Sequence, residues 1–432
     1  MDRKIIFHID VNSAFLSWEA VHRIQDLKEE TDLRTFPSAV GGDVSRRHGI
    51  ILAKSIPAKK YKIRTGEPVT DALRKCPSLV LVPPNHELYE KYSEAFISIL
   101  KKYTDIVEKY SIDEAFMDMT GTRRLFGDPI HVAHVIKDEI YQTLGFTVNV
   151  GISCNKLLAK MASDFEKPNL VHTLFPEEIE TKMWPLPVGE LFFVGQASEK
   201  KLHSIGIRTI GDLACADLHV VKQLLKKHGE VIWNFANGKG DSVVERTTPE
   251  NKGYGNSTTI AFDVTDAPTA KMILLSLAET VGRRLRRDQV RIESVSVTIR
   301  YHDLSDVSHQ GILNAATNIT KEIYDKACAL FDELWDGRPI RLLGVSTGRV
   351  SKGRGYRQID LFDSTGDLST GETAGKAQDH LLKYEKLEKL DQAIDQIREK
   401  FGSDAVIRAS FLNQDKIKPM TGKSFGNKEK KE

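Results

Sequence analysis

Two short acidic segments, far apart in the chain, constrain its fold more than any other feature. The first is residues 7–15, with the sequence FHIDVNSAF, and the second is residues 111–116, with the sequence SIDEAF. Asp10 ends an apolar run, whereas Asp113 and Glu114 lie between two β-rich runs. An adjacent pair of carboxylates between strands is most often a charged turn, because Asp favours turns. The alternative is that the pair belongs to a metal site.

The apolar pattern around these segments predicts four strands and two helices. The strands are expected at residues 4–10, 105–110, 115–119 and 147–153, and the helices at residues 86–103 and 129–144. This order is β-α-β-β-α-β, the ferredoxin-like arrangement, in which the first and third strands are antiparallel neighbours. Asp10 then lies beside Asp113 and Glu114, so three carboxylates are expected to converge on one edge of the sheet.

Three carboxylates without His or Cys favour a hard cation. Mg²⁺ prefers oxygen ligands and usually binds one or two carboxylates together with substrate phosphates. Two such ions hold the attacking and leaving oxygens of an in-line phosphoryl displacement. The topology therefore favours the metal site over the charged turn, and it indicates phosphoryl transfer as the reaction.

The two segments resemble the paired motif of Y-family translesion DNA polymerases of the bacterial, error-prone kind. The likeness extends from residue 4 to about residue 412, and several motifs agree in order. It implies an α+β multidomain fold: a ferredoxin-like palm, inserted fingers, a helix-hairpin-helix thumb and an α/β little-finger domain. The expected limits are residues 1–29 and 80–165 for the palm, 30–79 for the fingers, 166–240 for the thumb, 241–254 for a linker, 255–362 for the little finger, and 363–432 for a C-terminal extension with one helix and a disordered end.

Composition sets broader limits. The chain has 432 residues and a net charge of only +2, so any DNA contact must come from local basic patches. The apolar run at the N-terminus ends at Asp10, which predicts neither a secretory signal nor a membrane span. The four cysteines are widely scattered, which argues against a zinc site and fits a reducing cytoplasm.

The resemblance assigns the carboxylates to two Mg²⁺ ions. It implies that Asp10 and Asp113 bridge both ions, that the Val11 carbonyl completes one coordination shell, and that Glu114 holds the ion on the primer side. The neighbouring His8 is expected to be a structural residue of the strand.

Two lysines are candidates for binding the incoming nucleotide. Lys59 lies in a basic segment that, considered alone, is a solvated turn; in the family an Arg usually contacts the triphosphate there. Lys160 matches the family's triphosphate-binding lysine, and Lys156 lies on the same helix face four residues earlier. The backbone N–H groups around Ser13, Ala14 and Phe15 are expected to bind phosphate oxygens as well.

Phe15 lies five residues after Asp10, where the family places its steric gate. A ring beneath the sugar leaves no room for a 2′-OH, so such a residue rejects ribonucleotides. The alternative is an ordinary core residue of the helix.

Residues 191–213 predict a helix, a tight Gly turn and a second helix, which resembles a helix-hairpin-helix. Gly195 would let backbone N–H groups approach a DNA phosphate; a generic pair of helices is the alternative. Further DNA contacts are expected in the little finger, where the alternative is a solvated surface: Ser257, Thr258, Arg349, Lys352 and Arg354. An arginine cluster at residues 283–291 has the same two interpretations, DNA contact or solvated surface.

Residues 358–362, with the sequence QIDLF, resemble a sliding-clamp binding peptide. Gln358, Leu361 and Phe362 would fill a pocket of the partner; the alternative is a terminal strand that packs into its own domain. A helix follows, closed by Gly402, and is expected to dock on the molecule through an apolar stripe; the alternative is that the stripe binds a partner helix. The stripe consists of Tyr384, Leu387, Leu390, Ile394, Ile397 and Phe401.

The sequence thus predicts a cytoplasmic, monomeric DNA-directed DNA polymerase. Such an enzyme would copy damaged templates with low fidelity, using primer-template DNA, dNTPs and a sliding clamp. The sequence has no second set of carboxylates suggestive of a 3′→5′ exonuclease, so proofreading is not expected. Two alternatives remain: a catalytically inactive DNA-repair accessory protein with the same fold, and a palm-type nucleotide cyclase.

Overall fold

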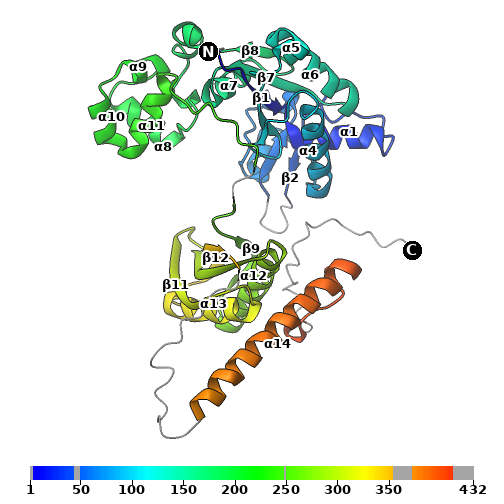
Figure 1. The fold of residues 1–432 in the computed structure, drawn as a ribbon, viewed down its shortest axis with the longest axis vertical. Helices are drawn as coiled ribbons and strands as arrows, with labels where there is room; N and C mark the ends of the chain where they lie inside the picture. Colours follow the sequence, from blue (N-terminus) through cyan, green and yellow to red (C-terminus); the bar gives the residue numbers. More distant parts are fainter. Residues whose placement is uncertain (1–2, 43–48, 248–249, 354–371, 412–432) are drawn as a thin grey trace. The chain divides into compact units, whose positions relative to one another are not determined.

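The computed structural model describes residues 3–42, 49–247, 250–353 and 372–411, with backbone only for residues 372–383. The chain forms two compact units, divided near residue 250 (Figure 1). None of the described helices combines the length and apolar character that crossing a membrane requires.

A five-stranded sheet in the order β5-β6-β1-β7-β8 is the centre of the first unit. Its strands are β1 (Ile6–Val11), β5 (Val107–Lys109), β6 (Glu114–Asp118), β7 (Val148–Ser153) and β8 (Val171–Thr173). β1 pairs antiparallel with both β6 and β7, so the predicted neighbours are adjacent at the middle of the sheet. This pairing confirms the ferredoxin-like arrangement expected from the sequence.

Helices cover both faces of this sheet, which explains why every residue of β1 is buried. Phe7 and Ile9 pack into a core with residues of α1 (Ala14–Gln25), α4 (His86–Leu100) and α6 (Pro129–Leu144). Ile6 and Phe116 pack on the other face against Ala159 of α7 (Lys156–Ser163). The remaining helix of this part is α5 (Arg123–Phe126).

Helix ends follow local sequence signals in one case and depart from them in another. Asp128 accepts a hydrogen bond from the His131 N–H, and Pro129 is the first residue of α6, as expected. Asn12 has a side chain of the type that caps helices, but Ser13 takes the N-cap position of α1, and the Asn12 side chain donates to Thr147 Oγ1 over 3.2 Å.

The segment inserted between α1 and α4 forms a separate small layer. A three-stranded sheet in the order β3-β2-β4 packs with two short helices around its own core. The elements are β2 (Ser38–Gly41), β3 (Ile51–Lys54), α2 (Ile56–Lys59), α3 (Val69–Lys75) and β4 (Val80–Val82).

A helical part ends the first unit. Its helices are α8 (Gln196–Ser204), α9 (Ile210–Cys215), α10 (Leu218–Leu225) and α11 (Lys227–Ala236), preceded by the short turns η2 (Pro176–Glu178), η3 (Ile179–Met183) and η4 (Val188–Glu190). Gly206, with φ +87°, makes the tight turn between α8 and α9. After α11 the chain returns to the central sheet, where Val244 packs against Ile6 and Phe116.

The second unit has a four-stranded sheet in the order β11-β10-β12-β9. Its strands are β9 (Gly255–Val264), β10 (Val290–Tyr301), β11 (Asp306–Thr317) and β12 (Ile340–Lys352), and its helices are α12 (Ala267–Arg287) and α13 (Thr320–Leu334). Val295, Val297 and Ile299 alternate along β10 and are fully buried in the core that these helices complete. One face of the sheet is therefore covered by the two helices.

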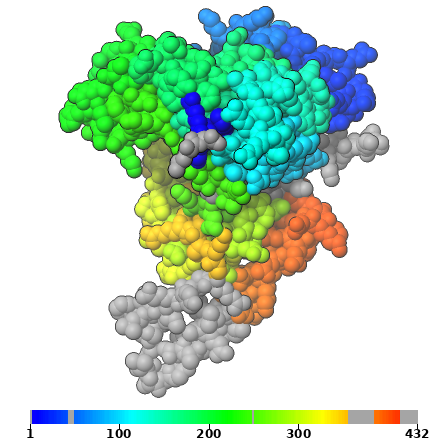
Figure 2. Space-filling model, turned by 45° about the horizontal axis from the view of Figure 1, so that its top comes forward, coloured from blue at the N-terminus to red at the C-terminus, as the bar shows by residue number. Residues whose placement is uncertain are grey.

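Helix α14 (Glu372–Phe401) lies against the other elements of the second unit (Figure 2), and ion pairs join it to α12. Arg286 of α12 binds Asp391 at 3.0 Å and Asp395 at 2.6 Å, and Asp391 also accepts from the Thr320 N–H. Leu390, Ile397 and Phe401 are instead 50%, 39% and 68% exposed. The stripe prediction is therefore wrong for these three residues.

Several predicted residues lie outside the part of the chain that the structure describes. They are Arg354 and the three residues of the proposed clamp peptide, Gln358, Leu361 and Phe362. The 3₁₀ turn η5 (Ala409–Phe411) is the last described element.

Candidate active site

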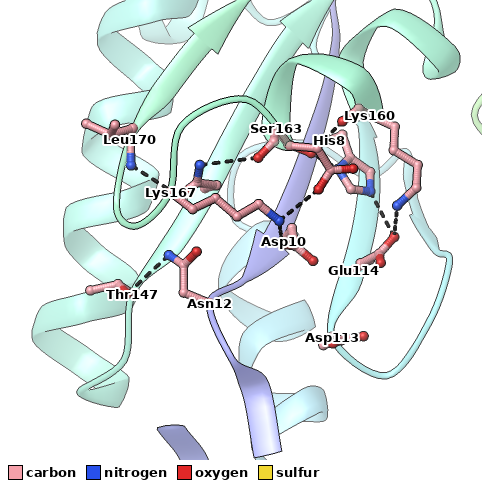
Figure 3. A network of polar contacts seen from close by, with 12 residues as sticks. His8, Asp10, Asn12, Asp113, Glu114, Thr147, Lys160, Ser163, Lys167 and Leu170 are labelled. Carbon is pink, nitrogen blue, oxygen red and sulfur yellow. Dashed lines mark hydrogen bonds and ion pairs between the residues drawn. The ribbon is translucent and has the colours of Figure 1, made fainter. Parts of the chain in front are cut away.

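Strand pairing places the predicted carboxylates on one edge of the central sheet. Asp10, near the end of β1, pairs directly with Glu114, the first residue of β6. Residues directly opposite each other in an antiparallel pair project from the same face of the sheet. Asp113 precedes β6, and its carbonyl accepts the Val11 N–H over 3.0 Å. The backbone thus holds all three residues within one short stretch of the edge (Figure 3).

The three side chains do not form a finished metal cage. Asp113 Oδ1 accepts from Ser111 Oγ over 2.6 Å, and Figure 3 shows this carboxylate apart from those of Asp10 and Glu114. Within the described ranges, no three His, Cys, Asp or Glu side chains are grouped closely enough to share one ion. The backbone brings Asp10, Asp113 and Glu114 to one edge of the sheet, as predicted. Their three carboxylate groups do not meet at one point.

Glu114 is bound by two nitrogen groups. Lys160 of α7 donates from Nζ to Oε2 over 2.5 Å, and Nε2 of His8 lies 3.2 Å from the same oxygen. Burial acts to raise the pKa of Glu114, but the hydrogen bonds with His8 and Lys160 outweigh burial and lower it to about 2. Glu114 is therefore a fixed carboxylate at neutral pH.

Asp10 has a different partner. Lys167 donates from Nζ to Asp10 Oδ2 over 2.5 Å and to Asp164 Oδ1 over 2.8 Å. Burial raises the pKa of Asp10 to about 6, although the Lys167 ammonium opposes this shift. Burial also acts to lower the pKa of Lys167, but the two carboxylates raise it. A buried, unusually basic carboxylate is a strong ligand for any cation that replaces the ammonium.

His8 links the strand to helix α7. Its Nδ1 lies 2.7 Å from Ser163 Oγ, which itself donates to the Lys160 carbonyl over 2.8 Å. Burial lowers the pKa of His8. The sequence predicted a structural role for His8 and did not single out Lys167, since neither residue's contact with a carboxylate is visible in a linear pattern.

Phe15 lies in an aromatic cluster beside this edge. Its ring stacks on Tyr89 with a centroid distance of 4.4 Å, and the Tyr89 hydroxyl donates to Glu19 over 2.8 Å. Phe15 is only half-buried, whereas Tyr89 is fully buried. The ring is thus held in place by the core while part of it stays accessible.

The start of α1 offers backbone N–H groups. Ser13 adopts a left-handed conformation with φ +49°, and its side chain caps no N–H of the first turn. Uncapped N–H groups at a helix N-terminus bind anions readily.

The predicted lysines differ in their surroundings. Lys160 is buried at Glu114, whereas Lys59 is exposed at the end of α2. Lys156 binds Glu108 at 3.0 Å and Asp241 at 3.7 Å, which makes it a structural link and not a free phosphate ligand.

The predicted DNA contacts also differ in exposure. Gly195 is the N-cap of α8 with open space around it. On β9, Ser257 is exposed but the Thr258 side chain is buried. Arg349 is exposed on β12, and Lys352 pairs with Glu250.

Two arginines of the predicted basic cluster are engaged by α14. Arg286 binds Asp391 and Asp395, and Arg291 binds Glu388 at 2.6 Å. These carboxylates therefore occupy two of the guanidinium groups that the sequence offers as possible ligands of DNA phosphates.

The donor set at the sheet edge fits a hard divalent cation. Asp10, Asp113 and Glu114 supply only oxygen ligands, and lysine ammonium groups already balance the charge of two of them. Oxygen ligands suited to a hard divalent cation are therefore present, with the side-chain arrangement described above.

Comparison with protein families gives three matches. The sequence profile of the impB/mucB/samB family matches residues 9–164, and the profile of the C-terminal domain of that family matches residues 251–361. The profile of the IMS family HHH motif matches residues 176–207.

The chain is also similar to bacterial proteins named DNA polymerase IV. It is 44% identical to the protein of Clostridium acetobutylicum over 412 residues, covering 95% of this chain and 99% of that protein. It is 37% identical to the protein of Acetivibrio thermocellus over 414 residues, covering 95% of this chain and 98% of that protein. It is 35% identical to DNA polymerase IV 1 of Bacillus subtilis over 424 residues, covering 98% of this chain and 96% of that protein.

A solved structure confirms the fold class. A Y-family DNA polymerase chimera superposes with a TM-score of 0.71 at 23% identity, covering 81% of this chain and 100% of that chain. The predicted α+β multidomain fold is therefore correct.

Proposed function

The chain belongs to the impB/mucB/samB family, the Y-family DNA polymerases, and from this premise we propose that it copies damaged DNA templates with low fidelity. The observation that carries the proposal is the pairing of Asp10 with Glu114, with Asp113 adjacent, on one edge of a ferredoxin-like sheet. An inactive accessory protein has no need of this acidic edge, which argues against that alternative.

The acidic edge is the proposed site of two Mg²⁺ ions. Asp10 and Asp113 would hold both ions, the Val11 carbonyl would complete the ligands of one ion, and Glu114 would hold the ion beside the primer. When bound, the ions would lower the pKa of the primer 3′-hydroxyl and balance the charge of the phosphoryl group that is transferred. Glu114, with its lowered pKa, stays ionised for this role throughout the physiological pH range.

The lysines of the site would exchange partners when substrate binds. Lys160 would move its hydrogen bond from Glu114 to a phosphate oxygen of the dNTP, because the cation takes over the carboxylate. Lys59 and the N–H groups of Ser13, Ala14 and Phe15 would bind the remaining phosphate charge. Phosphate positioning of this kind supplies most of the catalysis in phosphoryl transfer.

Phe15 is the proposed steric gate. Its stack on the fully buried Tyr89 fixes the ring, so a 2′-hydroxyl placed against the accessible side meets a rigid surface. Flexible side chains would give way, and discrimination between sugars would be lower.

The remaining contacts extend the proposal beyond the chemical centre. Gly195 would approach primer-template DNA from the first unit. The contacts proposed for the second unit are Ser257, Thr258, Arg349, Lys352 and Arg354. Gln358, Leu361 and Phe362 would bind a sliding clamp. We expect a cytoplasmic monomer without a proofreading exonuclease.

Primer extension tests the proposal. Purified protein, Mg²⁺ and all four dNTPs should extend a labelled primer on an undamaged template and across an abasic site, and should leave a mismatched 3′-end unexcised. The outcome that contradicts a polymerase is tight primer-template binding without extension, which would favour the accessory protein.

A further inference from the structure

Helix α14 carries two parallel rows of side chains of opposite character. The polar row consists of Tyr384, Glu388, Asp391, Asp395 and Arg398, and the apolar row consists of Leu387, Leu390, Ile394, Ile397 and Phe401. Within each row, successive residues are alternately three and four positions apart, so each row runs along one side of the helix. The helix can therefore present a polar side and an apolar side to different surfaces.

The polar row faces the rest of the second unit. Arg398 lies 3.5 Å from Glu279 of α12, and both side chains are more than nine-tenths buried. The same is true of Asp391 and Arg286, the pair described above. Buried ion pairs of this kind often stabilise a protein no more than apolar residues of similar volume would. The helix thus docks through the side that gains less free energy from burial.

The apolar row is left largely on the solvent side. Leu390, Ile397 and Phe401 are exposed, and Leu387 and Ile394 are half-buried. Single exposed apolar side chains are ordinary on protein surfaces, but a continuous exposed row marks an interaction site. The alternation of three and four is the spacing of the a and d positions of a coiled coil, sustained here over about 21 Å of helix. The row therefore has the pattern of a surface that binds another helix.

Basic side chains border the exposed side of this row. Lys386 and Lys400 each precede a residue of the row, Leu387 and Phe401, which is a position from which coiled-coil helices form ion pairs with their partner. Both lysines are exposed, and neither ammonium forms an ion pair with the residues that the structure describes. Ala393, at the equivalent position between them, is small and exposed. The opposite border of the apolar row is the polar row, which is already docked.

We propose that the apolar row of α14 binds an amphipathic helix of another protein, which carries acidic residues along the edge that meets Lys386 and Lys400. Apolar side chains at heptad spacing would pack against the row, and carboxylates would pair with the two ammonium groups. The docked polar row holds α14 in position before the partner arrives, which lowers the ordering cost of binding.

A second copy of α14 does not fit this surface. An antiparallel pair of copies would bring the lysines of one copy against those of the other, and like charges repel. A parallel pair would need the edge formed by the polar row, which is buried against the second unit. The partner is therefore a helix of different sequence.

A synthetic peptide of about three heptads is the probe. It carries Ile and Leu at the a and d positions and Glu at the flanking positions, and its binding to the full-length protein is measured by fluorescence anisotropy. We expect saturable binding. The same peptide with Lys in place of every Glu should bind at least about tenfold more weakly, because like charges then meet. Added salt should reduce this difference.

Leu390→Ala combined with Ile397→Ala removes the most exposed apolar contacts of the middle of the row. The affinity for the acidic peptide should fall at least about tenfold, since buried apolar anchors dominate helix binding. The thermal unfolding temperature should stay unchanged, because both side chains are exposed in the free protein. Leu304→Ala, at another exposed apolar position of the second unit, is the matched control and should change neither quantity.

Each other outcome overturns the proposal. The acidic peptide could fail to bind the wild-type protein, or could bind the double variant equally well, and either result would exclude the apolar row as its site. Equal binding of the acidic and basic peptides would exclude an acidic partner. A dimer of the wild-type protein in sedimentation velocity that the double variant does not form would assign the row to a second copy. A lower unfolding temperature of the double variant would show that the row serves the fold.

Discussion

Asp10 and Glu114 face each other across β1 and β6, yet their carboxylates are bound by two different lysines. Lys167 takes the first and Lys160 the second, so each negative charge is balanced separately. Unbalanced carboxylates this close would repel each other in a partly buried site. The two lysines therefore explain how the protein keeps an acidic edge folded, and a divalent cation must compete with them.

Asp113→Asn should abolish primer extension with little effect on folding. The amide keeps the size of the side chain but removes the charge that a cation requires, so we expect the rate to fall by about three orders of magnitude, comparable to losing a group that acts in the transition state. Single-turnover extension measures this, with the far-UV circular dichroism spectrum as the control. Residual activity within about tenfold of wild type would contradict the role of Asp113.

Lys167→Met should destabilise the protein in EDTA and less so in Mg²⁺. Removing one partner of a mostly buried ion pair leaves Asp10 and Asp164 unpaired. Because Lys167 is partly exposed, we expect a discounted loss of about 1–2 kcal/mol. Urea unfolding measures it, and Lys167→Arg, which keeps the charge, is the control. If added Mg²⁺ leaves the difference between wild type and Lys167→Met unchanged, the ammonium and the cation do not share a site.

The stability of the protein in EDTA should depend on the ionisation of Asp10. The pKa of Asp10 is raised from 3.8 to about 6. The contribution of its protonated form to the free energy of unfolding is therefore fully present below about pH 3.8 and is lost as the pH rises through 6. By linkage, a shift of this size amounts to roughly 1–3 kcal/mol. The unfolding free energy of wild type minus that of Asp10→Asn should fall by this amount between pH 4 and pH 7. Parallel pH profiles of the two proteins would contradict the raised pKa.

Phe15→Ala should relax the selection against ribonucleotides. Removing the ring opens the space for a 2′-hydroxyl, so the ratio of kcat/KM for dNTP to that for rNTP should drop at least about tenfold. Tyr89→Phe is the matched control: it keeps the aromatic stack and removes only the hydroxyl that donates to Glu19. An unaltered ratio in Phe15→Ala would make Phe15 an ordinary core residue.

Arg286→Met should release α14 from the second unit. Arg286 and Asp391 are both more than nine-tenths buried, and breaking such a pair leaves a buried charge without compensation. We expect a loss of about 3–5 kcal/mol in the unfolding free energy of that unit and faster hydrogen exchange in α14. Leu390→Ala, at an exposed position of the same helix, should change stability by less than about 0.5 kcal/mol. The reverse ranking would restore the apolar stripe as the docking surface.

The sequence by itself determined the strand order and, through it, the meeting of Asp10 with Glu114. Apolar periodicity, the cap at Asp128 and Pro129, and the order β-α-β-β-α-β are local signals, and a ferredoxin-like sheet leaves one way to pair the first and third strands. The sequence did not determine which side chains bind these carboxylates. Lys167 and His8 reach the carboxylates only because α7 and the loop after it fold back on β1, and a linear pattern does not contain that distance.

The same limit applies to helix α14 and to Phe193. The helix carries an apolar set and an acidic set, both at helical spacing, and its own sequence favours the apolar one. The surface of the second unit decides which set of side chains packs on it, because Arg286 and Arg291 of that surface require carboxylate partners. Phe193 lies in the tight turn of residues 191–194 before α8 and has φ +74°, a backbone conformation that its residue type does not predict. Local sequence fixes elements and pairing, whereas the choice among possible partners depends on which surfaces the fold brings together, and only the tertiary structure decides that.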